Sequence, residues 1–281
     1  MALEKLHTVM IVGNYSNKTY VLYSREIRLL LNYYPDIPAD ELTQDHILKY
    51  IRYIKEVHQA SYSKTRLFAM SCQFFFKNVI QKECILPPKI YPRKEHKLPL
   101  VMPQDEMLRL FAAIPTFKNR LILQFIYSCG IRLEELQRLE PGDIDSKNMR
   151  IYIRKSKGNR DRYTVLSQKI LDDLRLYYLQ YRPVKYLFNG RNPGSQMSSR
   201  NLQWIMKQAS KKAGLNQAYH LHTLRHSFAT HLVEHNVNIH TIKELLGHAN
   251  IKTTMGYLHL QTNRISGFIS PIDQLKHGKD V

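Results

Sequence analysis

Residues 220–260 read HLHTLRHSFATHLVEHNVNIHTIKELLGHANIKTTMGYLHL, and this stretch is the most informative part of the chain. Its spacing places Leu224, Phe228 and Leu232 on one face of a helix, together with His231. Polar side chains of several chemistries gather in the same stretch: His222, Arg225, His226, His248 and Tyr257. We therefore expect a mainly helical segment that displays a cluster of reactive groups.

The residue types in this cluster suit a phosphate group. Arg225 follows His222 by three positions, so both side chains project the same way if the first turn is helical. A guanidinium can hold two phosphate oxygens, and an imidazole can add a hydrogen bond or move a proton near neutral pH. Tyr257 adds a phenol, whose pKa of about 10 makes it a better leaving group from phosphorus than an aliphatic alcohol. A phosphotyrosine formed here would be reversible.

The charge balance of the chain points to a polyanionic partner. Its 281 residues include 42 Lys and Arg against 23 Asp and Glu, which gives a formal net charge of +19. This excess favours nucleic acid, although a ribosome-associated protein or one bound to an anionic membrane would show the same imbalance. No apolar run approaches the roughly 20 residues that a membrane helix needs, so we expect no membrane partner.

Cysteine usage and the first residues of the chain favour a reducing cytoplasm. Cys72, Cys84 and Cys129 form no CxxC pair, which argues against a disulfide framework or a cysteine zinc site. The N-terminal residues lack a long apolar core and a small-residue cleavage site, so they do not resemble a signal peptide. We expect a cytoplasmic, nucleoid-associated protein that needs neither a metal nor a cofactor.

The N-terminal region, residues 1–86, is predicted to be a helical DNA-binding domain. Three helices are predicted. The first ends before Pro35 and has Val21, Ile27, Leu30 and Leu31 inward; the second follows an N-cap at Thr43 and has Ile47, Ile51 and Ile54 inward. The third runs from Ser63 to Ile80 and has Leu67, Met70, Phe74 and Ile80 inward. The remaining face is rich in basic side chains, and we assign DNA contacts to Lys49, Arg52, Lys64 and Arg66. Taken one at a time, each of these residues is best interpreted as an ordinary solvent-exposed charge, but together they favour a phosphate-binding surface.

Residues 87–103 are predicted to be a linker, because prolines repeatedly interrupt any periodic pattern there. Residues 104–281 form the second predicted domain. It begins with two helices, the second of which stops at Gly130. Two alternating segments, MRIYIRK and RYTVL, flank the turn KGNRD and predict a β-hairpin. Helices follow from Ser167 to Tyr181 and from Ser199 to Ala213. The predicted fold class is mainly α with a small β-hairpin or sheet (α+β).

Four motifs in this order resemble the tyrosine recombinase family, also called phage-type integrases. HTLRHSFATHL and ELLGHANIKTTMGYLH are similar to its C-terminal His-x-x-Arg, Leu-Gly-His and Tyr signature. Upstream, YSCGIRLEELQRL resembles the segment with the family's first catalytic arginine, and KSKGNRDRYTVL resembles its lysine-bearing hairpin. The resemblance covers most of residues 100–260, and the helical N-terminal region and proline-rich junction are similar to the family's core-binding (SAM-like) domain and linker.

The resemblance implies that Tyr257 is the nucleophile of a site-specific DNA recombinase. Arg132 and Arg225 would neutralise charge on the nonbridging phosphate oxygens. Glu135, one turn after Arg132, matches an acidic position that orients partners. The implied reaction passes through a covalent 3′-phosphotyrosyl intermediate and a Holliday junction, with double-stranded recombination sites as substrate. A homo-tetramer would form on DNA, from monomers or dimers, and the C-terminal tail would dock on a neighbouring subunit.

The remaining roles also follow from the resemblance. Lys157 would protonate the departing 5′ oxygen, with Lys155 as the alternative hairpin lysine. His222 would assist deprotonation of the tyrosine or bind the phosphate, and His248 would bind the phosphate. His226 is assigned a supporting structural role, because its four-residue spacing from His222 could bind zinc but further ligands are missing.

Two other functions share parts of this pattern. A type IB topoisomerase-like enzyme would use similar residues and reseal its own strand. A DNA-binding accessory protein would keep the fold without the chemistry, but the complete set of candidate residues speaks against it. The nucleophile's own segment also departs from helical propensity, because Gly256 precedes Tyr257 and predicts a loosely held tyrosine.

Overall fold

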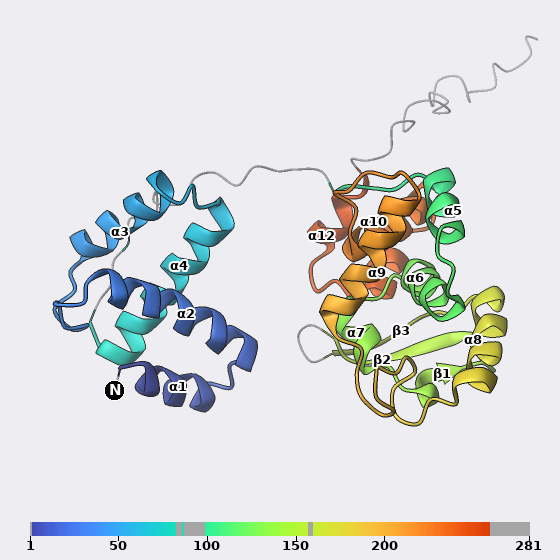
Figure 1. Ribbon diagram of the computed structural model, residues 1–281, viewed down its shortest axis with the longest axis horizontal. Helices are drawn as coiled ribbons and strands as arrows, with labels where there is room; N and C mark the ends of the chain where they lie inside the picture. The colour runs from blue at the N-terminus through green and yellow to red at the C-terminus, as the bar shows by residue number, and fades with distance from the viewer. Residues whose placement is uncertain (1, 83–85, 87–98, 157–159, 259–281) are drawn as a thin grey trace, which may run out of the picture. The chain divides into compact units, whose positions relative to one another are not determined.

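The computed structural model describes residues 2–82, 86, 99–156 and 160–258, with the side chains of 155, 156 and 160 left out. The chain divides into two compact units, Met1–His96 and Lys97–Val281 (Figure 1). The first unit contains α1 (Ala2–Val12), α2 (Asn17–Tyr33), α3 (Gln44–Glu56), α4 (Tyr62–Phe75) and the π-helical turn η1 (Phe76–Ile80). Within the described ranges, no helix is both long and apolar enough to cross a bilayer.

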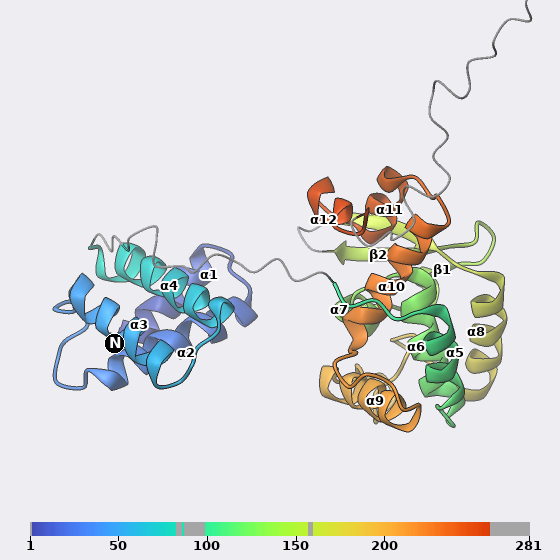
Figure 2. The same cartoon turned by 90° about the horizontal axis from the view of Figure 1, so that it is seen from above.

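The second unit combines helices with a small sheet, as Figures 1 and 2 show from two directions. Its elements are α5 (Gln104–Ala112), α6 (Phe117–Cys129), α7 (Leu133–Arg138), the 3₁₀ turn η3 (Pro141–Asp143), β1 (Ile144–Asp145), β2 (Arg150–Ser156), β3 (Arg160–Val165), α8 (Gln168–Tyr181), α9 (Ser199–Lys212), α10 (Leu221–Glu234), α11 (Ile239–Leu246) and α12 (Ile251–Met255). The predicted fold class, mainly helical with a small β-sheet, is confirmed.

In the first unit, three helices start where a hydroxyl side chain caps them. Ser16, Thr43 and Ser61 each accept a hydrogen bond from a backbone N–H in the first turn of α2, α3 and α4. The N-cap predicted at Thr43 is confirmed. Helix α1 was not predicted, yet it buries Leu6 and Met10 against the same core.

The inward face predicted for the helix from Ser63 to Ile80, which is α4 and η1 in the structure, is wrong by about one position. Phe68, Cys72 and Phe75 are buried, whereas Met70 is 44% exposed and Leu67 only half-buried. Apolar residues lie on both sides of this helix, so periodicity alone allows two phases, and packing against α2 selects one. In α2, Val21 is likewise exposed rather than inward.

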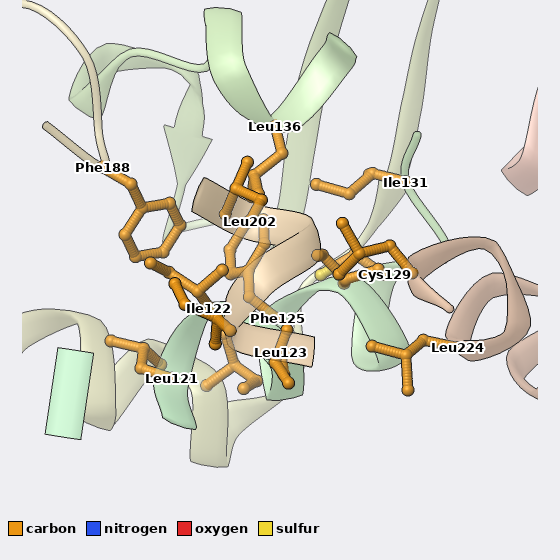
Figure 3. Close-up of a cluster of buried hydrophobic side chains, with 14 of the residues drawn as sticks. Leu121, Ile122, Leu123, Phe125, Cys129, Ile131, Leu136, Phe188, Leu202 and Leu224 are labelled. Carbon is orange, nitrogen blue, oxygen red and sulfur yellow. The ribbon is translucent and has the colours of Figure 1, made fainter. Parts of the chain in front are cut away.

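Helix α6 is the centre of the second core. Leu121, Ile122, Leu123 and Phe125 are all fully buried, so most of the helix surface is apolar and packs in the core, while Gln124 and Ser128 lie on a half-buried polar edge (Figure 3). Helices α8 and α10 both pack on it. Since α10 carries several candidate site residues, the core holds them through α6.

The sheet has the order β1-β2-β3 and is antiparallel throughout. The predicted hairpin corresponds to β2 and β3, while the two-residue strand β1 was not predicted. Ile151 pairs with Thr164, and Ile153 pairs with Arg162. Directly opposed residues share a face, so Arg162 points to the same side as buried Ile151 and Ile153.

Gly130 ends α6 where the chain must turn close to α10. Its φ is +61°, and a Cβ there would lie 2.3 Å from Cδ1 of Phe228. Only glycine satisfies both the left-handed backbone and the close approach.

We expect Gly130→Ala to destabilise the second unit far more than Gly214→Ala. Gly214 has a similar φ of +65° but open space around its Cβ, so alanine there costs only the left-handed strain of about 1–2 kcal/mol. Urea unfolding followed by fluorescence of Trp204, the single tryptophan, measures this unit. Equal midpoints for the two variants would contradict the steric argument.

Candidate active site

The candidate residues of the second unit lie on four neighbouring helical segments. Helix α10 packs on α11, and α11 packs on α12 (Figures 1 and 2). The placements are Arg132 at the N-cap of α7, Glu135 within α7, His222, Arg225 and His226 on α10, His248 between α11 and α12, and Tyr257 just after α12. Hydrogen bonds link several of these side chains into one site.

Arg225 is the most deeply buried charged group of the site, with 2% of its surface exposed. Nη1 donates to the carbonyl of Gly130 at 2.5 Å, and Nη2 donates to the carbonyl of Leu246 at 2.6 Å. These carbonyls lie at the C-terminal ends of α6 and α11, where helix dipoles are negative. Burial lowers the pKa of Arg225 to about 9, so it stays charged at neutral pH.

His248 is held as a neutral ring with a defined tautomer. Arg225 Nη2 lies 3.2 Å from Nε2 of His248, and a guanidinium has no acceptor atom. Nε2 therefore accepts, which places the ring hydrogen on Nδ1, 2.9 Å from Oγ1 of buried Thr254. Burial, reinforced by the charge of Arg225, lowers the pKa of His248 to about 3.

Glu135 joins two arginines. Its carboxylate accepts from the backbone N–H of Arg132 at 2.8 Å and from Nη1 of Arg132 at 2.9 Å. Arg162 adds a bidentate pair, with both N–O distances at 2.8 Å. Burial opposes the charged carboxylate, but these hydrogen bonds and charges outweigh it and lower the pKa of Glu135 to about 2.

Arg162 was missed by the sequence reasoning. Its Nε also donates to the carbonyl of Leu245 at 2.9 Å, so it ties β3 to the end of α11. A Cβ on Gly247 would lie 2.7 Å from Cδ of Arg162, which explains the glycine there. The available signal was strand alternation, since an arginine between exposed Asp161 and Tyr163 must point inward.

Tyr257 is buried, with 3% of its surface exposed. Its hydroxyl lies 2.9 Å from Nδ1 of His226, and its backbone N–H donates to the carbonyl of Thr254 at 3.0 Å. Burial raises the pKa of the phenol, although Arg225 and Arg132 act in the opposite direction. Gly256 follows α12 as its C-cap, so it ends the helix rather than weakening its interior, and Tyr257 packs within an apolar cluster.

His222 does not occupy the place expected for an assistant of Tyr257. It is exposed at the start of α10, and its ring centroid lies 5.0 Å from that of His226. Partial burial and the charge of Arg225 lower its pKa. Of the two histidines, His226 contacts the phenol.

Lys157 lies outside the described residues, as do the side chain of Lys155 and the C-terminal tail from residue 259. In the first unit, Lys49 is exposed on α3. Arg52 pairs with Glu56 at 2.8 Å, and Arg66 donates to the hydroxyl of Tyr62 at 2.9 Å.

Lys64 has a structural partner. Its ammonium lies 2.5 Å from the carboxylate of buried Glu26, which links α4 to α2. An ammonium committed to a buried carboxylate contributes less to a DNA surface than an unshared one.

The arrangement is suited to bind an anion. Arg132 and Arg162 both bind the carboxylate of Glu135, and Arg225 lies near enough for its charge to interact with all three groups. The excess of positive charge is held in fixed positions, which favours a phosphate over a neutral ligand. In the part of the chain that the structure describes, no three His, Cys, Asp or Glu side chains gather as a metal site would require.

Comparison with known proteins gives consistent results for both units. The phage integrase family model matches residues 101–264, and the phage integrase N-terminal SAM-like domain matches residues 3–85. The tyrosine recombinase XerA of Thermococcus kodakarensis is 32% identical over 236 residues, covering 80% of this chain and 78% of that protein.

Solved structures share the fold. The XerH site-specific recombinase bound to a palindromic difH substrate superposes with a TM-score of 0.74 at 19% identity, covering 94% of this chain and 82% of that one. The Tn1549 transposon integrase bound to transposon right-end DNA gives a TM-score of 0.73 at 17% identity, covering 91% and 94%.

We expect Glu135 to stabilise the second unit at neutral pH and to lose this effect in acid. Its folded pKa of about 2 lies below the ordinary 4.5, so its contribution, about 3 kcal/mol, is complete above the ordinary value and fades as pH falls towards 2. Urea unfolding of the wild type and Glu135→Gln, followed by Trp204 fluorescence at several pH values, measures the difference.

The same titration of Glu244→Gln, an exposed carboxylate at the end of α11, is the control and should match the wild type. A wild-type advantage over Glu135→Gln that does not shrink in acid would exclude the ion pairs as its source.

Proposed function

This chain belongs to the phage integrase family of tyrosine recombinases, and we propose that Tyr257 cuts and rejoins DNA strands at the site built by α7, α10, α11 and α12. The enzyme is a site-specific recombinase that acts in DNA integration and recombination. The observation that carries the assignment of the site is the contact network on α10, in which Arg225 reaches His248 while His226 reaches Tyr257.

In the proposed reaction, the phenolic oxygen of Tyr257 attacks a backbone phosphorus and forms a 3′-phosphotyrosyl bond as its proton passes to a neighbouring histidine. Arg132 and Arg225 bind the nonbridging oxygens and stabilise the charge of the pentacoordinate transition state. The bond from phosphorus to the 5′ oxygen breaks, and this oxygen takes a proton from Lys157, or from Lys155 as the alternative. The new 5′ hydroxyl attacks the phosphotyrosine of a partner duplex, so a Holliday junction forms without nucleotide consumption.

His248 takes part through the arginine it contacts. Its Nε2 accepts a hydrogen bond from Arg225 in the structure. A phosphate oxygen that binds Arg225 would therefore take the place of His248 Nε2 on a guanidinium that is already ordered. Glu135 and Arg162 hold Arg132 in place. This preorganisation reduces the rearrangement needed when a phosphate binds.

We further propose that residues 1–86 form a core-binding domain that contacts DNA, that residues 87–103 link it to the catalytic domain 104–281, and that the protein acts on nucleoid DNA in the cytoplasm as a homo-tetramer. The match of residues 3–85 to the SAM-like domain supports the first part. Lys49, Arg52 and Arg66 are the proposed contacts, and Lys64 holds the domain together through Glu26.

The test of the proposed nucleophile is a covalent adduct. The protein is incubated with nicked DNA fragments from a library of candidate sites, and SDS-resistant adducts are recovered and sequenced. We expect adducts with the wild type and none with Tyr257→Phe, which keeps the ring and its packing but lacks the attacking oxygen. DNA binding by the variant should be unchanged, and an adduct that survives the substitution would assign the nucleophile elsewhere.

A second, labelled DNA duplex added to the covalent adduct distinguishes an enzyme that reseals its own strand from one that exchanges strands. Transfer of label supports recombination, whereas quantitative resealing of the original strand supports topoisomerase-like chemistry. Binding with no adduct on any fragment would support an accessory protein.

Arg225→Lys should reduce adduct formation severely, by roughly 3 kcal/mol or more in transition-state stabilisation. An ammonium cannot donate to both the Gly130 and Leu246 carbonyls and to a phosphate in the planar geometry of a guanidinium. Single-turnover cleavage measures the loss. A near-normal cleavage rate for Arg225→Lys would show that a positive charge at this position is enough to stabilise the transition state.

A further inference from the structure

We propose that His226, and not His222, accepts the phenolic proton of Tyr257 during strand cleavage. This inference rests on the proposed role of Tyr257 as nucleophile. It assigns a proton-transfer role to a side chain that the sequence assigned only to structural support.

The geometry singles out His226. Its Nδ1 lies 2.9 Å from the hydroxyl oxygen of Tyr257, a direct hydrogen-bond distance. Tyr257 is 3% exposed, so bulk water is kept from most of the phenol. Within the described residues, His226 is the hydrogen-bond partner of this hydroxyl, while His222 is exposed one turn earlier on α10.

His226 is in the protonation state that a base requires. Burial, together with neighbouring positive charge, lowers its pKa to about 4, so the ring is neutral near pH 7. With its hydrogen on Nε2, Nδ1 presents a lone pair to the phenol. The titratable and charged groups around it are Tyr257 after α12, His248 before α12, and His220, His222 and Arg225 at the start of α10.

Substrate binding would make this base stronger at the moment it is needed. In the free protein, the charge of Arg225 disfavours protonation of His226. A phosphodiester anion bound to Arg225 and Arg132 offsets that charge, and an anion nearby stabilises an imidazolium. The pKa of His226 therefore rises towards the range of an effective proton acceptor when DNA occupies the site.

The proton balance of the step is closed. The Tyr257 oxygen forms its bond to phosphorus as its proton moves to Nδ1 of His226, and the 5′ oxygen leaves with a proton from the lysine donor. In rejoining, the 5′ hydroxyl gives its proton back to the now neutral lysine as it attacks phosphorus, the phenolic oxygen leaves phosphorus, and His226 returns its proton to that oxygen. No further reactant is needed.

The first test is the pH profile of His226→Asn. The Oδ1 of asparagine can occupy the place of Nδ1 and accept a hydrogen bond from the phenol, but it does not take up the proton. Single-turnover adduct formation is measured on a DNA fragment that the wild type cleaves, between about pH 7 and about pH 9. We expect a loss of roughly a hundredfold or more near pH 7.

The pH dependence should also change. The wild-type rate should vary little over this interval, whereas the His226→Asn rate should rise about tenfold per pH unit as hydroxide generates the phenolate. His222→Asn should lower the rate but keep the wild-type pH profile. His235→Asn, an exposed histidine at the far end of α10, should behave as the wild type.

The second test separates the base from the acid. In DNA with sulfur in place of the bridging 5′ oxygen, the leaving thiolate needs no proton, because thiols are far stronger acids than alcohols. This substrate should restore cleavage by Lys157→Ala, or by Lys155→Ala if that lysine is the donor, and leave His226→Asn impaired. His226→Gln, assayed in parallel with DNA binding as a check on folding, should show the same lack of rescue.

Three outcomes would overturn the inference: a wild-type pH profile in His226→Asn, its rescue by the sulfur substrate, or cleavage faster than wild type, which would mean that the contact only restrains Tyr257. If the wild type formed no adduct on any fragment, the proposed function itself would fail. A wild-type adduct with a normal His226→Asn variant would reject the role of His226 alone.

Discussion

The catalytic unit depends on a buried guanidinium that needs acceptors on several sides. Arg225 lies among the ends of helices, and its charge is tolerated because the carbonyls of Gly130 and Leu246 face it at the negative ends of α6 and α11. For those carbonyls to turn inward, α6 and α11 must stop in left-handed conformations, which Gly130 and Gly247 provide. Arg225 thus binds the ends of two helices together, and these ends shape the site.

The same constraint determines the electrostatics. Cations outnumber carboxylates near Arg225, and Glu135 remains ionised because Arg162 and Arg132 both bind it. Burial, reinforced by these cations, keeps the nearby histidines neutral, with the pKa of His248 at about 3 and that of His226 at about 4. A site in this state attracts a phosphate, and the phosphate then alters the basicity of the groups around it. Binding and proton transfer are coupled through charge.

The agreement between sequence and structure differs from element to element for physical reasons. The caps at Thr43 and Ser167 act locally, so the starts of α3 and α8 could be predicted from the sequence. The inward face of α4 could not, because apolar residues occupy both sides and only the packing against α2 selects between them. Helix α1 was overlooked for a related reason: its buried face becomes evident only against the other three helices.

The sequence alone determined the family, the order of the motifs and the chemical types at the site, because His-x-x-Arg, Leu-Gly-His and Tyr257 are local patterns with a specific spacing. Tertiary structure alone decided which groups touch. Arg162 reaches Glu135 from a strand 27 residues away, and His226 reaches Tyr257 across 31 residues. Such contacts depend on how helices and strands pack, and spacing along the chain does not encode them.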